Sequence, residues 1–280
     1  MSAQAGVGHP SSYFGSLFTL VRTSLWPLVR PPSHSRRAEA ARRLARHGLL
    51  ITATTSAAII ALMVWLDGRE IVLMPPRGTP SLWPVRILTD FGKDAYVLSL
   101  LAAMVLVVGF VAAALQGTSR ARWLGVGVRL QFVFFAVVVP LLAGELIKFV
   151  AGRSRPFAGG YANAFNFVPF AGTEAYASFP SAHAITAFAL AFAVSAVWPR
   201  ARAAMILYAL LIAASRLVLL AHHPSDVVAG GLIGVVGAMA VRYWFAARRL
   251  GFAIHRDGQI VPLRSVSGRS KRVARGASAS

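Results

Sequence analysis

The sequence has 280 residues, of which 56% are hydrophobic and only 14% are charged, and its formal net charge is +20. Soluble domains have about a quarter of their residues charged, so this composition excludes an ordinary soluble protein and indicates several membrane-spanning segments. The chain has no cysteine, which excludes disulfides and thiolate chemistry.

The first 47 residues form a basic segment in which we expect no cleavable signal peptide, because the first long apolar run begins only at Gly48. Residues 13–21 are apolar enough for a short helix in the membrane interface, and a disordered tail is an equally good interpretation. The pair Pro31-Pro32 would end such a helix.

Six continuous apolar runs follow, and each predicts a transmembrane helix rather than the alternating strand of a barrel. Each run is long enough to cross about 30 Å of hydrocarbon at about 1.5 Å per residue. The predicted helices are 48–66, 95–115, 124–150, 182–198, 203–221 and 226–246. We therefore expect an all-α fold, with a six-helix transmembrane bundle over residues 48–248 and a basic, disordered tail over residues 249–280.

The distribution of basic residues predicts the orientation in the membrane. Most of the 29 lysines and arginines lie in the N-terminal segment, in the turns after the second and fourth helices, and in the tail. By the positive-inside rule both termini face the cytoplasm, and the loops after the first, third and fifth helices face the other side. Topology and attraction to anionic lipids then explain the positive charge, so no nucleic-acid partner is expected. The Arg- and Ala-rich usage favours a bacterial inner membrane, with the outer loops in the periplasm.

The loop over residues 67–94 carries equal numbers of acidic and basic residues and is broken by Pro75-Pro76. Its segment around Trp83 has the mixed character of an interfacial segment. A lid or lateral gate and simple anchoring both fit this loop, and anchoring is the simpler interpretation.

The first of three polar stretches ends the third predicted helix with Lys148, Arg153 and Arg155. Several cations together favour a dianion, and the planar fork of arginine matches phosphate oxygens. Snorkelling of long basic side chains at a helix end is the alternative. Glu145 lies three residues before Lys148 on the same helical face and is placed to pair with it.

The second polar stretch opens the fourth predicted helix with Ser181, Ala182 and His183. Ser181 is a good N-cap, and a helix N-terminus presents free backbone N–H groups to an anion. His183 in the first turn is able to give that anion a proton. Ordinary capping beside an interfacial histidine is the alternative.

The third polar stretch contains Arg216, His222 and Asp226, between the last two apolar runs. Charge inside a membrane segment is costly, so Arg216 is a functional-site hypothesis. A turn at Pro224 would let Asp226 bond one nitrogen of His222 and leave the other free as nucleophile or base. Arg216 and His222 lie on different faces of a continuous helix, so both reach one cavity only if that helix loosens near its end.

All three stretches fall on the same side of the membrane, so they are predicted to converge. The set lacks the carboxylates that Mg²⁺ needs. Two histidines and one aspartate are suitable zinc ligands, but Lys148, Arg155 and Arg216 would repel a dication. We therefore expect no metal and no cofactor, and a phosphate fits the charge better.

The stretches Lys148-x6-Arg155-Pro156, Pro180-Ser181-x-His183 and Ser215-Arg216-x5-His222-x3-Asp226 together resemble the three-part signature of the type 2 phosphatidic acid phosphatase family. That superfamily includes lipid phosphate phosphatases, bacterial undecaprenyl-diphosphate phosphatases and, more distantly, vanadium haloperoxidases. The resemblance covers residues 95–245 in order, spacing and placement between helices. One position departs from it, because Ala182 stands where the family usually has glycine, although its backbone N–H is retained.

The resemblance implies a role for each matching residue. His222 would be the nucleophile that forms a phosphohistidine, Asp226 its orienting carboxylate, and His183 the general acid for the leaving oxygen. The implied phosphate cradle consists of Lys148, Arg155, Ser181, Ala182 and Arg216. His223 and Arg153 lie outside the signature, so we take His223 as a loop residue and Arg153 as an accessory cation at most.

The leading hypothesis is a metal-independent membrane phosphatase that acts on a lipid phosphate or isoprenoid diphosphate at the outer leaflet. A lipid phosphotransferase of the same chemistry is the enzymatic alternative, and it differs in what attacks the phosphohistidine. A transporter or flippase for an anionic lipid, without hydrolysis, is the alternative from another class. Haloperoxidase chemistry is disfavoured because that branch is generally soluble.

Overall fold

The computed structural model of the chain describes residues 13–156, 158, 164–255 and 259–263. Its elements are almost all helices, with a single pair of short strands near the C-terminal end of the described part. The helices that precede the third predicted membrane segment are α1 (Tyr13–Val29), α2 (His34–Trp65), α3 (Asp67–Leu73), α4 (Trp83–Asp90) and α5 (Asp94–Ala114). The later elements are α6 (Gly117–Ala151), α7 (Ala182–Val197), α8 (Arg202–Val218), α9 (Pro224–Ala247), β1 (Phe252–Ile254) and β2 (Ile260–Pro262).

The N-terminal segment is helical on both sides of its proline pair. α1 forms where a short interfacial helix was one of two interpretations, and it ends before Pro31-Pro32 as expected. α2 begins at His34 rather than at Gly48, so residue 47 is not a structural boundary. Good helix formers and the ion pair between Glu39 and Arg43 extend this helix beyond the apolar run.

Membrane-spanning helices make up most of the described chain. Five segments are long and apolar enough to cross a membrane, and they are His34–Trp65, Pro80–Ala114, Gly117–Ala151, Pro199–Val218 and Pro224–Ala247. The expected multi-pass helical fold is therefore confirmed. α7 is apolar but has 16 residues, which at about 1.5 Å per residue is shorter than the hydrocarbon core, so a sixth span rests on this helix alone.

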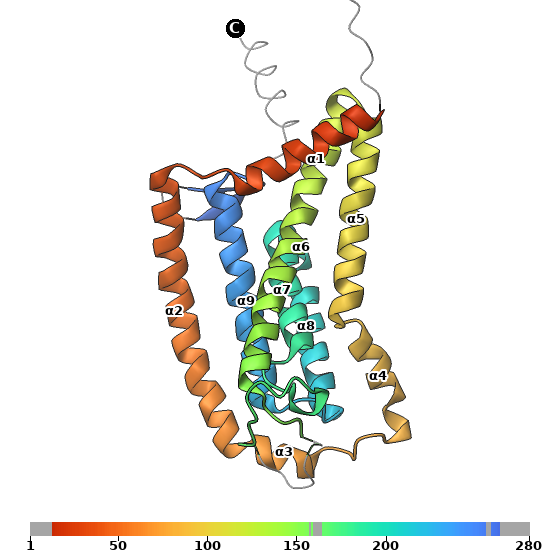
Figure 1. Cartoon of the computed structure of the whole chain (residues 1–280), viewed down its shortest axis with the longest axis vertical. Helices are drawn as coiled ribbons and strands as arrows, with labels where there is room; N and C mark the ends of the chain where they lie inside the picture. Colours follow the sequence, from red (N-terminus) through yellow and green to blue (C-terminus); the bar gives the residue numbers. More distant parts are fainter. Residues whose placement is uncertain (1–12, 157, 159–163, 256–258, 264–280) are drawn as a thin grey trace, which may run out of the picture.

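α9 is the central helix of the bundle, and α2, α6 and α7 pack around it (Figure 1). Glycines allow the closest of these contacts. A Cβ at Gly230 would lie 2.5 Å from the carbonyl oxygen of Ser181, and one at Gly234 would lie 2.5 Å from that of Ile185. Small residues four apart allow helix backbones to approach closely in membranes. This contact sets the N-terminus of α7 against the N-terminus of α9.

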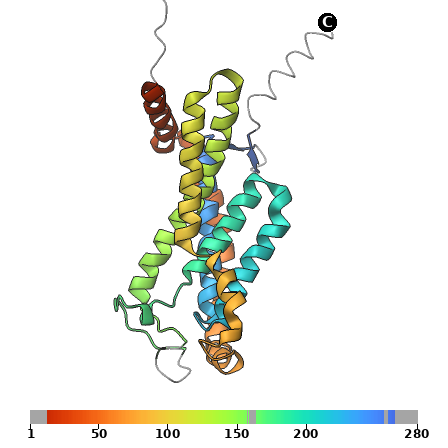
Figure 2. The ribbon, with the colours of Figure 1, turned by 90° about the vertical axis from the view of Figure 1, so that its right-hand side faces the viewer.

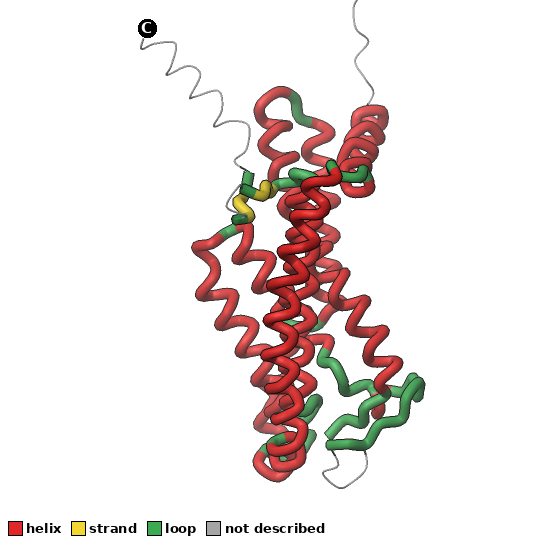
Figure 3. Tube along the Cα trace, turned by 90° about the vertical axis from the view of Figure 1, so that its left-hand side faces the viewer, coloured by secondary structure: helices red, strands yellow, loops and turns green. Residues whose placement is uncertain are grey.

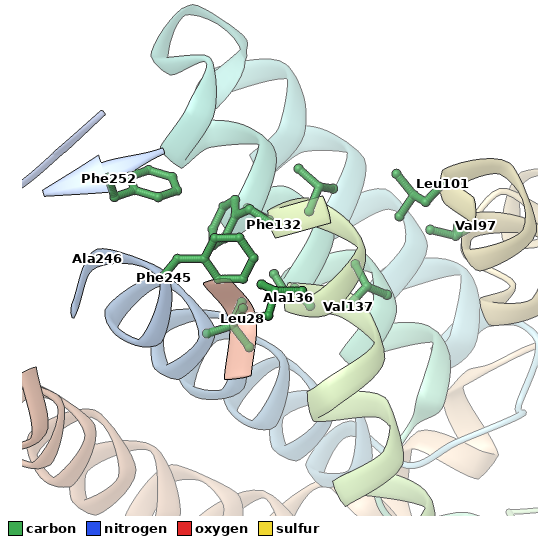
Figure 4. Close-up of a cluster of buried hydrophobic side chains, with 14 residues drawn as sticks. Leu28, Val97, Leu101, Phe132, Ala136, Val137, Phe245, Ala246 and Phe252 are labelled. Atoms are coloured by element: carbon green, nitrogen blue, oxygen red, sulfur yellow. The ribbon is translucent and has the colours of Figure 1, made fainter. Parts of the chain in front are cut away.

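An aromatic cluster holds the end of the bundle opposite the polar stretches (Figure 4). The ring of Phe132 lies 5.5 Å from that of Phe245 and 4.7 Å from that of Phe252, between centroids. Phe252 belongs to β1, which pairs antiparallel with β2. The prediction of disorder from residue 249 is therefore wrong for this hairpin, because its apolar residues fill a slot against α6 and α9 that the basic composition of the tail concealed.

The two ends of the bundle differ in what they carry. α3, the connection between α6 and α7 and the start of α9 lie at one end, whereas α1 and the hairpin lie at the other (Figures 1 and 2). Figure 3 shows the long loop and the two strands at these opposite ends. α6 stops at Gly152, whose φ is 54° and whose Cβ would lie 1.8 Å from the carbonyl oxygen of Val168. This glycine directs the chain back across the end of the bundle.

Candidate active site

Backbone hydrogen bonds bring the three polar stretches together. The N–H of Ser178 donates to the carbonyl of Arg153 at 3.0 Å, which joins the end of α6 to the segment before α7. The N–H of Ser181 donates to the carbonyl of Asp226 at 3.1 Å, which joins the start of α7 to the start of α9. The residues that the sequence predicted to converge therefore lie at one end of the bundle.

Arg153 is the centre of a buried network of charges. Its side chain has no exposed surface, and its guanidinium makes five hydrogen bonds. The acceptors are Asp226 Oδ1 at 2.6 Å, Asp67 Oδ2 at 2.7 Å, Ser225 Oγ at 2.6 Å, and the Ala164 carbonyl at 3.1 Å from Nε and 2.7 Å from Nη2. All five N–H donors of an arginine are thus used. The sequence assigned Arg153 at most an accessory place in a phosphate site, and the structure adds a different role, because Arg153 neutralises two buried carboxylates.

Asp226 belongs to this network and does not bond His222. Its carboxylate accepts from Arg153, from Ser178 Oγ at 2.6 Å and from the N–H of His223 at 2.9 Å. His222 Nδ1 instead lies 2.8 Å from the carbonyl oxygen of Ser178. The expected direct contact is therefore wrong: the turn at Pro224 points Asp226 at Arg153, and Ser178 stands between the carboxylate and the imidazole.

The hydrogen bond from His222 fixes its tautomer. A carbonyl oxygen only accepts, so Nδ1 carries the hydrogen and Nε2 carries the lone pair. Burial, followed by the charges of Arg216 and Arg155, holds the pKa of His222 well below its usual 6.5. The imidazole is therefore neutral at physiological pH, with Nε2 as its basic and nucleophilic atom.

Helix α8 ends before it reaches His222. Its last residue is Val218, and Leu220 then adopts a φ of 48°, so the chain turns between Arg216 and His222. The sequence left open whether this helix loosens near its end, and the structure shows that it does. Arg216 is buried, and its Nη1 donates to Thr89 Oγ1 at 2.9 Å.

Arg155 and Arg216 line one cavity of about 450 Å³. Each has a buried Nε without a hydrogen-bond partner in the described part of the chain. Arg155 Nη1 lies 3.7 Å from a carboxylate oxygen of Glu174. Ala221, the residue before His222, also lines this cavity, which has a suitable size for a small ligand. A buried donor without a partner is costly, so an anion in this cavity would supply the acceptors that these arginines lack.

The remaining members of the predicted site surround the start of α7. Ser181 is its buried N-cap, with Oγ 3.5 Å from the N–H of Ala184, and Ala182 and His183 form its first turn. His183 is half-buried.

Lys148 pairs with Glu145, as its position on the same helical face predicted. Of the predicted site residues, Arg155 and Arg216 line the cavity, whereas His222, His183 and Lys148 lie outside that lining.

The loop over residues 67–94 contributes residues that the sequence analysis missed. Asp67 is fully buried, and besides Arg153 it accepts from the N–H of Ser225 at 3.1 Å. Arg77 and Arg86 line the same cavity as Arg155. The sequence showed equal numbers of acidic and basic residues in this loop. The structure shows that some of these charged residues are buried against the polar stretches.

Glu70 and His223 form a second buried pair next to this network. His223 Nδ1 lies 3.9 Å from Glu70 Oε2, and both residues are almost fully buried. Burial, followed by the charges of Asp67 and Asp226, raises the pKa of Glu70 to about 8. Burial also lowers the pKa of His223. His223 therefore lies in the loop before α9, as expected, but it is buried there at the site end.

The buried acids are arranged around a cation rather than a metal. Asp67 and Asp226 both accept from Arg153. In the described ranges, no group of three or more His, Cys, Asp or Glu side chains is placed to hold a metal ion. The charge that faces the cavity comes mainly from arginine.

Comparisons with known proteins agree with this arrangement. Residues 129–250, which include α7, α8, α9 and all three polar stretches, match the family model of the PAP2 superfamily. The Lipid A 1-phosphatase of Rhizobium johnstonii is 32% identical over 179 residues, which cover 61% of this chain and 71% of that protein. The Lipid A 1-phosphatase of Rhizobium etli is 31% identical over 179 residues, which cover 61% of this chain and 75% of that protein. No solved structure matches the chain.

Proposed function

The chain belongs to the PAP2 superfamily and is a phosphatase acting on lipid phosphates, and from this premise we propose that it cleaves them through a phosphohistidine on His222. One observation carries the proposal. His222 is a neutral imidazole held by the Ser178 carbonyl, beside two arginines whose buried Nε donors have no partner in the described structure. That combination provides a nucleophile next to a receptor for the phosphoryl oxygens.

The proposed reaction has two steps. In the first, His222 Nε2 attacks phosphorus, the bond from phosphorus to the lipid oxygen breaks, and His183 gives its proton to that oxygen. In the second, water attacks the phosphohistidine while His183 takes a proton from it, which releases inorganic phosphate and restores the free imidazole of His222. Phosphoryl transfer depends mainly on positioning and on stabilising the charge of the equatorial oxygens.

The proposed cradle supplies that stabilisation without a metal. Arg155 and Arg216 face the cavity with donors available, and the start of α7 offers Ser181 and the N–H of Ala182. Lys148 joins them when substrate competes with Glu145 for its ammonium group. We assign Asp226 the role of a positioning residue, because it acts on His222 through the side chain and carbonyl of Ser178.

The proposed topology has six spans, with α7 as the short one. Both termini are cytoplasmic, and the site faces the periplasm of a bacterial inner membrane. The support is the distribution of charge between the two ends, because the end with α1 carries the basic N-terminal helices and would contact anionic lipids. The opposite end has the site, where the buried acids Asp67 and Asp226 neutralise Arg153.

The test is phosphate release by purified protein in detergent, from several lipid phosphates, with and without chelator. We expect release that chelator does not abolish, and an acid-labile, base-stable phosphoenzyme after rapid quenching. Activity that disappears with chelator and returns only with added metal would contradict the cradle without metal. A phosphate ester of an added alcohol, formed in place of inorganic phosphate, would indicate a phosphotransferase, and lipid translocation without phosphate release would indicate a flippase.

A further inference from the structure

We propose that Arg77 and Arg86 form a second anion-binding subsite beside the phosphoryl cradle, which selects lipids that carry a second anionic group near the phosphate to be cleaved. Arg77 lies between α3 and α4, and Arg86 lies on α4. Neither belongs to the three polar stretches. The proposal rests on the proposed function, because it takes Arg155 and Arg216 as the cradle.

The charge of the cavity is the first argument. Among the described residues, its lining contains the guanidinium groups of Arg77, Arg86, Arg155 and Arg216 and a single carboxylate, that of Glu174. One phosphate monoester brings at most two negative charges, which Arg155 and Arg216 already balance. A cavity of about 450 Å³ with this excess of positive charge is complementary to a ligand with more than one anionic group.

The mutual effect of the arginines is the second argument. Burial lowers the pKa of Arg155, and the positive charge of Arg77 contributes to that shift. Both guanidinium groups line the same cavity, so their positive charges oppose each other there. An anion held between them would turn this repulsion into attraction, and the planar fork of arginine suits phosphate oxygens in particular.

The attachment of α4 to the cradle is the third argument. Arg216 Nη1 donates to Thr89 Oγ1 at 2.9 Å, and Tyr208 Oη donates to the carbonyl of Phe91 at 2.9 Å, so α4 is fastened to α8. Arg86 lies three residues before Thr89 and hence on the same face of α4. Arg86 Nη2 donates to the carbonyl of Thr79 at 3.2 Å, which holds its guanidinium at the edge of the cavity. The second subsite thus has a fixed position relative to the first.

Two kinds of lipid carry a second anionic group near the phosphate to be cleaved. In a lipid diphosphate the second anion is the phosphoryl group next to the one attacked, and in a lipid with two separate phosphates it lies elsewhere on the headgroup. Both place phosphate oxygens against Arg77 and Arg86 while the scissile group occupies the cradle. Substrates of the two kinds therefore distinguish the source of the second charge.

The experiment compares kcat/KM of the purified full chain for three lipids with the same acyl chains: a monophosphate, a diphosphate, and a lipid with two separate phosphates. The double variant Arg77→Ala/Arg86→Ala is compared with wild type and with Arg69→Ala, an exposed arginine on α3 outside the cavity lining. We expect wild type to have a higher kcat/KM for at least one doubly anionic lipid than for the monophosphate. In the double variant this ratio should fall about 10-fold to 100-fold, mainly because the KM for the doubly anionic lipid rises. Arg69→Ala should keep the preference. The lipid whose preference falls identifies the source of the second anion.

A preference that is unchanged in the double variant would overturn the second subsite while leaving the proposed function intact. Binding of inorganic diphosphate and inorganic phosphate, measured by calorimetry, tests the subsite independently of hydrolysis. We expect the ratio of their affinities to fall about 10-fold in the double variant and to stay constant in Arg69→Ala. Equal ratios in all three proteins would refute the subsite, whereas inactivity of wild type on every lipid would refute the proposed function alone.

Discussion

Arg153 and Arg155 lie two residues apart, yet the structure uses their guanidinium groups in opposite ways. Arg153 is fully buried and gives all its donors to oxygen atoms, two of them in the carboxylates of Asp67 and Asp226. Arg155 lines the cavity, has a buried Nε without a partner in the described chain, and lies 3.7 Å from its nearest carboxylate. The site therefore has a satisfied side, which we call the Arg153 network, and an unsatisfied side formed by the two arginines of the proposed cradle, Arg155 and Arg216.

This difference shows how stability and activity are divided. Removing one partner from a buried, bonded charge pair costs about 3–5 kcal/mol, because the other charge is left uncompensated. A buried donor without a partner already costs about 1–3 kcal/mol, and a ligand that accepts its hydrogen bond recovers that energy. Substitutions in the network should thus lower stability, and substitutions in the cradle should lower activity.

The largest effect is expected for His222→Ala, which removes the proposed nucleophile of the cradle. Phosphate release should fall by about 10⁴-fold or more, and no phosphoenzyme should form. The melting temperature should change little, since within the described structure the imidazole has one hydrogen bond, to the Ser178 carbonyl. His34→Ala, an exposed histidine at the start of α2, is the control and should retain full activity. Undiminished turnover in His222→Ala would remove this residue as nucleophile.

The next largest effect is expected for Arg153→Met, which breaks the network. The free energy of unfolding should fall by about 3–5 kcal/mol, because Asp67 and Asp226 lose their shared cation. Thermal melting in detergent measures this change. Adding Asp67→Asn to the same chain should recover part of the loss, since it removes one of the two uncompensated carboxylates. Equal stability of Arg153→Met and wild type would show that the network contributes no net stability.

Arg155→Met tests the cradle with the same substitution two residues away. We expect kcat/KM for lipid phosphates to fall by about 10²-fold to 10³-fold, as for the loss of one donor to a developing charge. The melting temperature should stay equal to that of wild type or rise, because the substitution removes a buried donor without a partner in the described chain. If Arg155→Met were as destabilising as Arg153→Met, the two sides of the site would not be distinct.

The sequence predicted the apolar helices, and it singled out the polar stretches of the proposed cradle, because both follow from local patterns. Apolar runs of sufficient length dictate helices, and 94–114 and 224–247 lie within two residues of the predicted 95–115 and 226–246. The spacing of Arg155, Arg216 and His222 within their stretches identified residues that the fold brings to one end. Each of these signals lies within a single stretch of chain.

The network could not be predicted in this way because its partners are far apart. Asp67 lies 86 residues before Arg153, and Asp226 lies 73 residues after it. Arg153 and Arg155 look alike in the sequence, and only the tertiary fold decides which one meets carboxylates. The same holds for Ser178, which takes the position beside His222 that the sequence assigned to Asp226. An acidic residue directly after a membrane span, as Asp67 is, was the available signal.

The smallest expected effect concerns Glu70, the carboxyl of the site end that lacks a hydrogen bond within the described residues. Burial, followed by Asp67 and Asp226, raises its pKa to about 8 from an ordinary value of 4.5. The folded protein then holds this proton more tightly than the unfolded chain does. The resulting stability is fully present below pH 4.5 and is lost as the pH rises through about 8.

Glu70→Gln removes this dependence because glutamine is neutral at every pH. We expect the variant to match wild type at about pH 4 and to exceed it by roughly 2 kcal/mol at about pH 9, where the buried carboxylate of wild type is ionised. Melting temperatures across this pH range measure the difference. Glu39→Gln, at a half-exposed carboxylate on α2, should give a curve parallel to wild type. Parallel curves for Glu70→Gln as well would mean that Glu70 titrates normally, and the Arg153 network would then extend its neutralising effect to this third acid.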